Sequence, residues 1–221
     1  MKIEFAQEIK EKVPRVTLLV GECEAEDSPT CDELWTEIER VSERMRTSYE
    51  IPMINKRPAI AATRAAYKAC GKEPNRYRPS CEAMCRRIVK GESLYRTSTL
   101  VDIGNLVSIV SGYSMGIFDR DKIEGDTLTL GVGREGEPYE AIHRGPLNIA
   151  GMPVLRDAAG GIATPTSDNA RTAISPTSRR LLIVINIYGE EQPAVDTADY
   201  ITGLLTRYAS ATGISFTMHR P

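Results

Sequence analysis

The stretch TSTLVDIGNLVSIVSGYSMGIFDRDKI, residues 97–123, decides the fold. Apolar residues recur at three- and four-residue steps from 100 to 110, which predicts a helix that is buried on most sides. Thr and Ser residues before it are N-cap candidates, and Gly112 ends it. Asp102 and Asn105 interrupt the apolar pattern three positions apart, hence on one side of the helix. Because buried polar side chains need hydrogen-bond partners or a ligand, we expect this helix to form the floor of a pocket.

A second segment carries most of the polar chemistry. Residues 164–172, TPTSDNART, bring hydroxyl, carboxylate, amide and guanidinium groups together just after the flexible pair Gly160 and Gly161. Such a loop can offer backbone N–H groups and hydroxyls to an ester or to a terminal ribose. A polar surface loop is the alternative. We expect this loop to form the wall of the pocket.

The order of the remaining patterns predicts an α+β fold. Helical patterns fill most of residues 31–91, and short strands follow the central helix. TLTLGVG (127–133), the turn GREGEP and PYEAIH (138–143) predict a hairpin. LLIVINIY at 181–188 is apolar enough to lie at the centre of a sheet. A helix at 195–208 and a terminal strand complete the chain.

Composition limits the classes of function. The 221 residues carry a net charge of -2, so no global basic field attracts nucleic acid. Five cysteines without scaffold spacing favour reduced thiols and a cytoplasmic protein. The charged start predicts no signal peptide, and no apolar run predicts a membrane span. Cys81 and Cys85 lie four residues apart, but histidines are too few nearby, so we expect no metal and no cofactor.

One region is locally basic. Residues 76–96 contain six basic residues against two acidic ones, with Tyr77 and Tyr95 among them, and they precede the central helix directly. This pattern is typical of a grip on backbone phosphates with a stacking aromatic ring. A solvated helix face is the alternative.

The run VDIGNLVSIVSGYSMGIFDRDKIEGD resembles a motif of the editing domain in the phenylalanyl-tRNA synthetase beta subunit. That domain combines the third and fourth modules of the subunit (B3/B4), and its motif is VDI-N-V followed by G-x-x-M-x-x-F-D-x-D-K-I. DAAGGIA, RTAIS and TSRRLLIVI follow in the order of the domain's Gly-Gly turn and its later strand. We expect residues 1–221 to form a single domain, and the resemblance covers roughly residues 75–190 of it. Residues 1–57 are its N-terminal strand and helix lead, and 194–219 its C-terminal helix and strand.

The resemblance implies a compact layered fold of mixed β-sheets with packed helices. It also implies a free-standing tRNA-binding domain, with tRNA and an amino acid or aminoacyl end as partners and no obligate protein partner. Such a domain would deacylate mischarged aminoacyl-tRNA in trans, with the 164–172 loop lining the cleft. The residues expected to bind substrate or RNA are Arg76, Arg87, Arg96, Asn105, Gly160, Gly161, Thr166, Ser167, Asp168, Arg171 and Thr172.

Two departures put tyrosine-specific editing in doubt. Gly116 stands where the bacterial pattern has His, and Val184 aligns with the Glu that reads a tyrosine hydroxyl. An unpaired buried hydroxyl costs about 1–3 kcal/mol, so that specificity does not carry over. His143 is expected in a surface hairpin and His219 near the end, so no positioned imidazole is predicted.

Three functions therefore remain open. One is a deacylase whose water is oriented by backbone donors and by the terminal hydroxyl of the tRNA. The second is a non-catalytic domain that binds an amino acid or a small metabolite in the same cleft. The third is a purely structural or partner-binding module.

Overall fold

The computed structural model describes residues 1–189 and 192–221. Helices dominate the first half of the chain after β2, and strands dominate the second, so the predicted α+β class is confirmed. The elements are β1 (Lys2–Phe5), α1 (Gln7–Lys12), β2 (Thr17–Glu24), α2 (Asp32–Ser48), α3 (Ile51–Ile54), α4 (Pro58–Cys70), α5 (Ser80–Val89), α6 (Thr99–Ser111), β3 (Met115–Asp119), η1 (Arg120–Lys122), β4 (Thr127–Val132), β5 (Glu140–Ala141), β6 (Gly145–Pro146), β7 (Pro153–Arg156), β8 (Gly161–Ala163), η2 (Ala170–Thr172), β9 (Arg180–Ile187), α7 (Gln192–Tyr208) and β10 (Thr212–His219).

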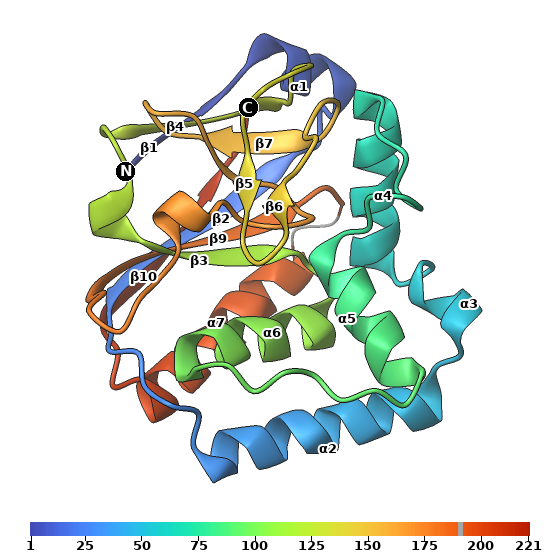
Figure 1. The fold of residues 1–221 in the computed structure, drawn as a ribbon, viewed down its shortest axis with the longest axis vertical. Helices are drawn as coiled ribbons and strands as arrows, with labels where there is room; N and C mark the ends of the chain where they lie inside the picture. Colours follow the sequence, from blue (N-terminus) through green and yellow to red (C-terminus); the bar gives the residue numbers. More distant parts are fainter. Residues whose placement is uncertain (190–191) are drawn as a thin grey trace.

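Two sheets stack on each other (Figure 1). One has the order β1-β4-β7-β8, in which β1 runs parallel to β4. The other has the order β10-β2-β9-β3 and is antiparallel throughout. Leu182 and Val184 of β9 face the core between the sheets, whereas Leu181 and Ile183 face the helices. The strand predicted to be central is therefore central, and it is buried on both faces because each face meets a different layer.

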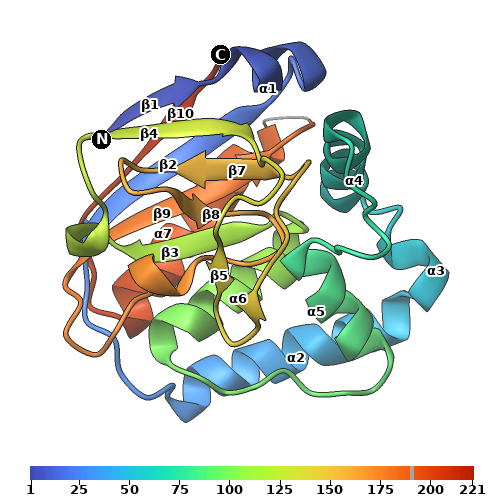
Figure 2. The same cartoon turned by 45° about the horizontal axis from the view of Figure 1, so that its top comes forward.

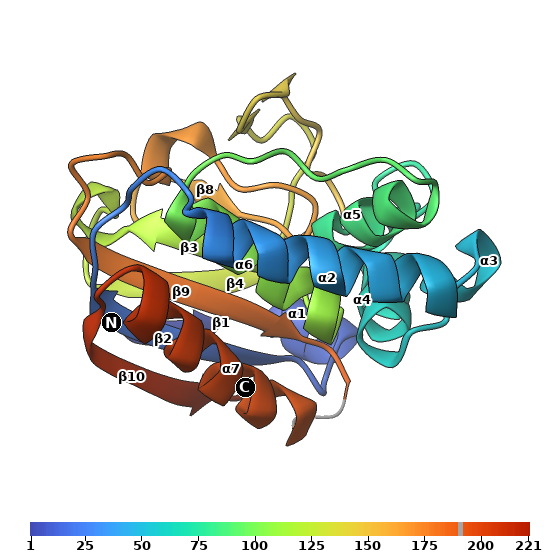
Figure 3. The same ribbon diagram turned by 90° about the horizontal axis from the view of Figure 1, so that it is seen from below.

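Helices cover the outer face of the second sheet (Figure 3). Helix α6 packs against α2, α5, α7 and β3, and Leu100, Ile103 and Leu106 are fully buried. Gly112 ends α6 with a φ of 83°, a left-handed conformation that glycine adopts without strain. The prediction of a central buried helix over this stretch is confirmed.

The predicted hairpin between 127–133 and 138–143 is wrong. Strand β4 pairs with β1 and β7, while β5 pairs with β6 in a separate small hairpin. After β4, Gly133 exchanges backbone hydrogen bonds with Met152 and Gly151, so the chain keeps its pairing with the β7 side. Arg156 then fixes Glu137 through two hydrogen bonds of 2.6 Å, which turns the chain away from β4.

The segment between α2 and α4 contains the short helix α3. The N-terminal lead joins the main body directly, because β2 lies between β9 and β10. Among the described residues, every helix falls short of the length and apolar character that crossing a bilayer requires.

Candidate functional site

A pocket of about 540 Å³ lies beside α6, within the size range of ligand sites. Its floor comes from α6, one side from the start of α5 and the edge strand β3, and the opposite wall from the 164–168 segment. The tip of the β5–β6 hairpin, residues 142–144, also lines it. Figure 2 shows this hairpin in front of α6. The predicted floor and the predicted wall therefore meet in one cavity.

The two polar residues of α6 have different roles. Asp102 is buried outside the pocket, where it accepts hydrogen bonds from the Thr30 hydroxyl and the Thr97 N–H. Burial raises the pKa of Asp102, although these hydrogen bonds oppose that effect. Asn105 lines the pocket, and its amide has no partner among the described residues. Asp102 thus fixes the entry to the helix, and Asn105 is left available for a ligand.

The wall owes its shape to its own hydroxyls. The Thr164 hydroxyl accepts from the N–H groups of Thr166 and Ser167 and donates to the Ser167 carbonyl at 3.0 Å. The Thr166 hydroxyl is 2.8 Å from the hydroxyl of Tyr67, which is fully buried. Most of the hydroxyl groups in this segment therefore hold the loop, and the Asp168 carboxyl is the wall group that remains free.

Asp168 is partly buried, and its carboxyl has no hydrogen-bond or ion-pair partner in the described part of the chain. Burial raises its pKa to about 8. Gly116 lies directly beneath it: a Cβ at that position would lie 2.8 Å from Asp168 Oδ2 and would overlap the ring of Phe118. The glycine that departs from the family pattern thus provides the space that Asp168 occupies.

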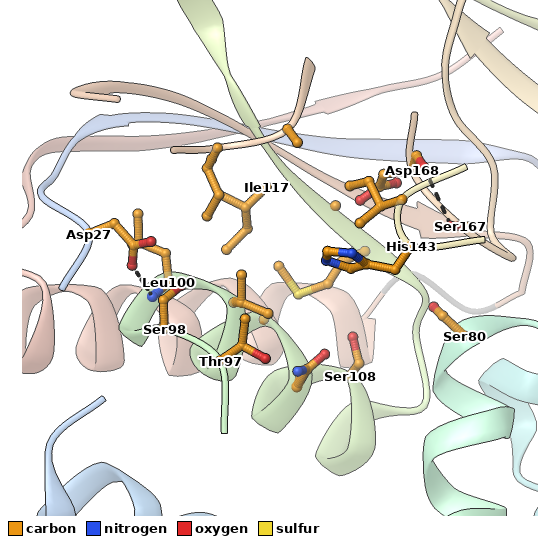
Figure 4. Close-up of a pocket in the computed structure, with 18 of the residues that line it drawn as sticks. Asp27, Ser80, Thr97, Ser98, Leu100, Ser108, Ile117, His143, Ser167 and Asp168 are labelled. Carbon is orange, nitrogen blue, oxygen red and sulfur yellow. Dashed lines mark hydrogen bonds between the residues drawn. The ribbon is translucent and has the colours of Figure 1, made fainter. Parts of the chain in front are cut away.

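His143 is exposed at the tip of the β5–β6 hairpin, as expected, but it also lines the pocket, which the sequence did not predict. In Figure 4 its ring projects between Ser108 of α6 and Asp168. The preceding residues are tied to the wall: Ile142 N–H donates to the Asp168 carbonyl at 3.0 Å, and Ala141 bridges to Asn169. His143 has a φ of 57°, so a turn in the left-handed region directs it into the cavity.

Of the residues predicted for the site, Asn105, Thr166, Ser167 and Asp168 line the pocket. The arginines lie outside its lining. Arg96 is paired with Asp32 at 2.7 Å and donates to the Thr30 carbonyl, while Arg87 pairs with Glu92 at 2.9 Å. Arg76 is exposed, with its guanidinium 5.5 Å from the centre of the Tyr77 ring. Their role as RNA contacts stays a prediction.

The other four residues build the support of the wall. Arg171 forms two hydrogen bonds to Asp157, at 2.7 and 3.0 Å, and Asp157 also accepts from the Gly160 N–H. Gly160 has a φ of 142°, and a Cβ on Gly161 would come within 2.9 Å of the Tyr139 ring. Thr172 is fully buried, and its hydroxyl has no partner among the described residues.

Val184 does not reach the pocket. It is 1% exposed and faces the core between the two sheets, opposite Gly116 in the pairing of β9 with β3. A carboxylate at this position would be buried among apolar side chains without a partner, which is costly. The residue that aligns with the family's recognition Glu is therefore a core residue in this chain.

Replacing Gly116 with alanine is expected to destabilise the protein by about 1–3 kcal/mol, because the new methyl group overpacks against Phe118 and Asp168. Urea unfolding measures the change. Gly104→Ala is a suitable control, since a Cβ there meets only Ile117 at ordinary contact distance. Equal stability of the Gly116→Ala variant and wild type would mean that Asp168 is not packed on this glycine.

Asp168 makes stability depend on pH with a defined sign. Its pKa is about 8 in the folded protein and near 4 in the unfolded chain, so its contribution to stability is complete below pH 4 and is lost as the pH rises through 8. From pH 5 to pH 9, the free energy of unfolding of Asp168→Asn should therefore rise by at least about 1 kcal/mol relative to that of wild type. Urea unfolding at both pH values measures this. Asp199→Asn, on the exposed face of α7, should follow wild type.

Comparisons with known proteins found a similar structure and a matching family model. The N-terminal fragment of the phenylalanyl-tRNA synthetase beta-subunit from Pyrococcus horikoshii is similar in structure, with a TM-score of 0.49 and 9% sequence identity. The match covers 100% of this chain and 54% of the fragment, so the chain spans about half of its length. No curated protein matches the sequence. The model of the B3/4 domain family matches residues 62–202, well over half of the chain, and includes α6, the 164–168 wall and the β5–β6 hairpin. The chain therefore belongs to the B3/4 domain family.

Proposed function

We propose that this B3/4 domain binds the aminoacyl end of tRNA in the pocket above α6 and hydrolyses its ester bond in trans. The observation that carries the proposal is that His143, Asn105 and Asp168 all line one cavity. An imidazole, a free amide and a carboxyl are the groups that ester hydrolysis uses. The family resemblance adds the expected substrate class, a mischarged aminoacyl-tRNA.

The roles follow from the chemistry of each side chain. The imidazole of His143 takes a proton from a water molecule as the water oxygen attacks the ester carbonyl carbon. The Asn105 amide donates a hydrogen bond to the carbonyl oxygen, on which negative charge develops. When the carbon–oxygen bond to the ribose breaks, the imidazolium returns the proton to the departing 3′ or 2′ oxygen. The products are a free amino acid and an uncharged tRNA.

The residues at the rim of the pocket favour the binding of an RNA strand next to it. Arg144 lines the mouth, is exposed, and has no ion-pair or hydrogen-bond partner in the described residues. The segment from Lys90 to Ser98 also borders the pocket, because Thr97 and Ser98 line it. Tyr95 is 72% exposed in this segment, and the guanidinium of Arg87 lies 4.4 Å from its ring centre. An exposed ring beside cations suits stacking on a nucleotide next to a phosphate.

The test of the proposal is incubation of the protein with a panel of aminoacyl-tRNAs while the remaining ester is followed. We expect faster deacylation for at least one aminoacyl group, with cleavage that saturates at high tRNA concentration. Rates equal to the spontaneous rate for the whole panel would remove the hydrolytic function.

Arg144→Ala is expected to weaken tRNA binding and to lower the slope of log affinity against log salt by about one, because one phosphate contact is lost. Filter retention of tRNA at several salt concentrations measures both quantities. Arg15→Ala, an exposed change before β2 and outside the pocket lining, should leave them unaltered. Binding by Arg144→Ala with the wild-type slope would place the RNA elsewhere.

The pairing of two arginines with carboxylates favours a second function, which does not involve RNA. Arg87 and Arg96 already have carboxylate partners, and the net charge of the chain is negative, which favours a domain that binds a free amino acid or small metabolite without RNA. Thermal shift with amino acids separates the two functions, because bound ligand stabilises the folded state. Stabilisation by an amino acid together with no tRNA retention would favour this second function.

A further inference from the structure

The pocket has two chemically different ends. Leu100, Val101 and Ile117 supply apolar surface towards the N-terminal part of α6, beside the polar residues Asp27, Thr97 and Ser98. Asp168, Ser167 and His143 lie at the other end, and Figure 4 shows them apart from Leu100 and Ile117. A ligand with a polar head at Asp168 and an apolar body against Leu100, Val101 and Ile117 would fit the cavity.

The polar end contains a carboxyl group without a partner. Asp27 also lines the pocket, but its carboxylate already accepts a hydrogen bond from the Leu100 N–H at 3.0 Å. The groups near Asp168 are the Tyr139 ring from the hairpin base, His143 from the hairpin tip and Gly116 from β3, and Arg144 lines the same pocket. The Tyr139 hydroxyl donates to the Ser167 carbonyl at 2.7 Å, and no ion pair joins Asp168 to His143 or Arg144 in the described residues.

We infer that Asp168 is the receptor for the ammonium group of an amino acid or aminoacyl ester whose apolar side chain occupies the opposite end of the pocket. For the ester this inference rests on the proposed function, whereas for a free amino acid it stands without tRNA. The ligand class is thus α-amino acids with an unmodified amino group and an aliphatic or aromatic side chain.

The choice of an ammonium over a hydroxyl follows from electrostatics. A neutral hydroxyl has many alternatives in this cavity, including Ser80, Ser108 and Ser167. A partly buried carboxyl without a cation remains protonated, as its raised pKa indicates, and a cation placed against it restores the ionised form. Binding of the ammonium therefore releases the carboxyl proton to solvent, and charge is conserved in the pocket.

The test compares isosteric pairs that differ only in the amino group. L-Leucinamide, L-valinamide and L-phenylalaninamide are titrated against their 2-hydroxy amide counterparts at pH 7, with isothermal calorimetry on the full chain. A charge-assisted hydrogen bond predicts that the amine of the best pair binds roughly 10- to 100-fold tighter than its hydroxy analogue. In Asp168→Asn this preference should fall to about one, while the affinity for the hydroxy analogue stays the same. Asp199→Asn should retain the full preference.

The same comparison is made with aminoacyl-tRNA and the matching 2-hydroxyacyl-tRNA. Equal affinity within every pair, or a preference that persists in Asp168→Asn, overturns the inference. If the protein still retains tRNA in that case, the proposed function remains intact. Amine preference on the small amides without tRNA retention supports the inference and removes the proposed function. Failure of every amide and every tRNA to bind overturns both.

Discussion

Replacing His143 with glutamine is expected to lower the rate constant for deacylation by roughly 100-fold or more, which is the usual contribution of a positioned general base. Glutamine keeps a polar side chain of similar reach but cannot take a proton from water. Because the proposed mechanism places the ring at the reacting ester rather than at the tRNA backbone, tRNA affinity should stay within about threefold of wild type. Single-turnover deacylation, with the protein in excess over aminoacyl-tRNA, measures the chemical step.

His219→Gln is the matched control, since His143 and His219 are the two histidines of the chain. His219 lies at the end of β10, where it pairs with Leu18 and is outside the pocket lining. Its replacement should leave the rate unchanged. If His143→Gln hydrolyses aminoacyl-tRNA as fast as wild type, the imidazole is not the base, and water must be activated by the RNA itself.

Glu82→Ala is expected to reduce the free energy of unfolding by about 3–5 kcal/mol. Glu82 is fully buried on α5 and accepts from Arg64 at 2.9 Å and from Arg86 at 2.8 Å. Its removal leaves two mostly buried guanidinium groups without their carboxylate, and that loss of a partner is the source of the penalty. Urea unfolding monitored by circular dichroism measures it.

Glu92→Ala serves as the comparison. Glu92 pairs with Arg87 at 2.9 Å, but both side chains are substantially exposed, so its removal should cost no more than about 1 kcal/mol. Similar losses for the two variants would show that the Glu82 pair is solvated in solution. Because α5 also carries Ser80 and Met84 into the pocket, loss of Glu82 should weaken ligand binding as well.

The sequence predicted the local elements better than their pairing. The period of α6 and the apolar run of β9 identified both correctly, because burial on most sides leaves a strong pattern. The hairpin after β4 was wrong, because alternation shows that a strand exists but not which strand it joins. Contacts such as Arg156 with Glu137 decide that pairing, and they join residues 19 positions apart.

The sequence also predicted only part of the site, because local patterns are visible in it and contacts between distant segments are not. Asn105 and the 164–168 wall could be found, since polar residues in a buried helix and a hydroxyl-rich loop stand out in the sequence. His143 could not, because its place depends on the bridge between Ala141 and Asn169 and on the left-handed turn at the hairpin tip. The link between Gly116 and Asp168 is also invisible along the chain, where the two lie far apart.

The most direct test of the account is a crystal structure of the protein with a non-hydrolysable aminoacyl end, a 3′-aminoacylamido-3′-deoxyadenosine that carries an apolar amino acid. We expect the carbonyl of the analogue beside Asn105 and His143, its ammonium at Asp168 and its side chain against Leu100 and Ile117. An analogue bound outside this pocket, or one that fails to bind at millimolar concentration, would contradict the account.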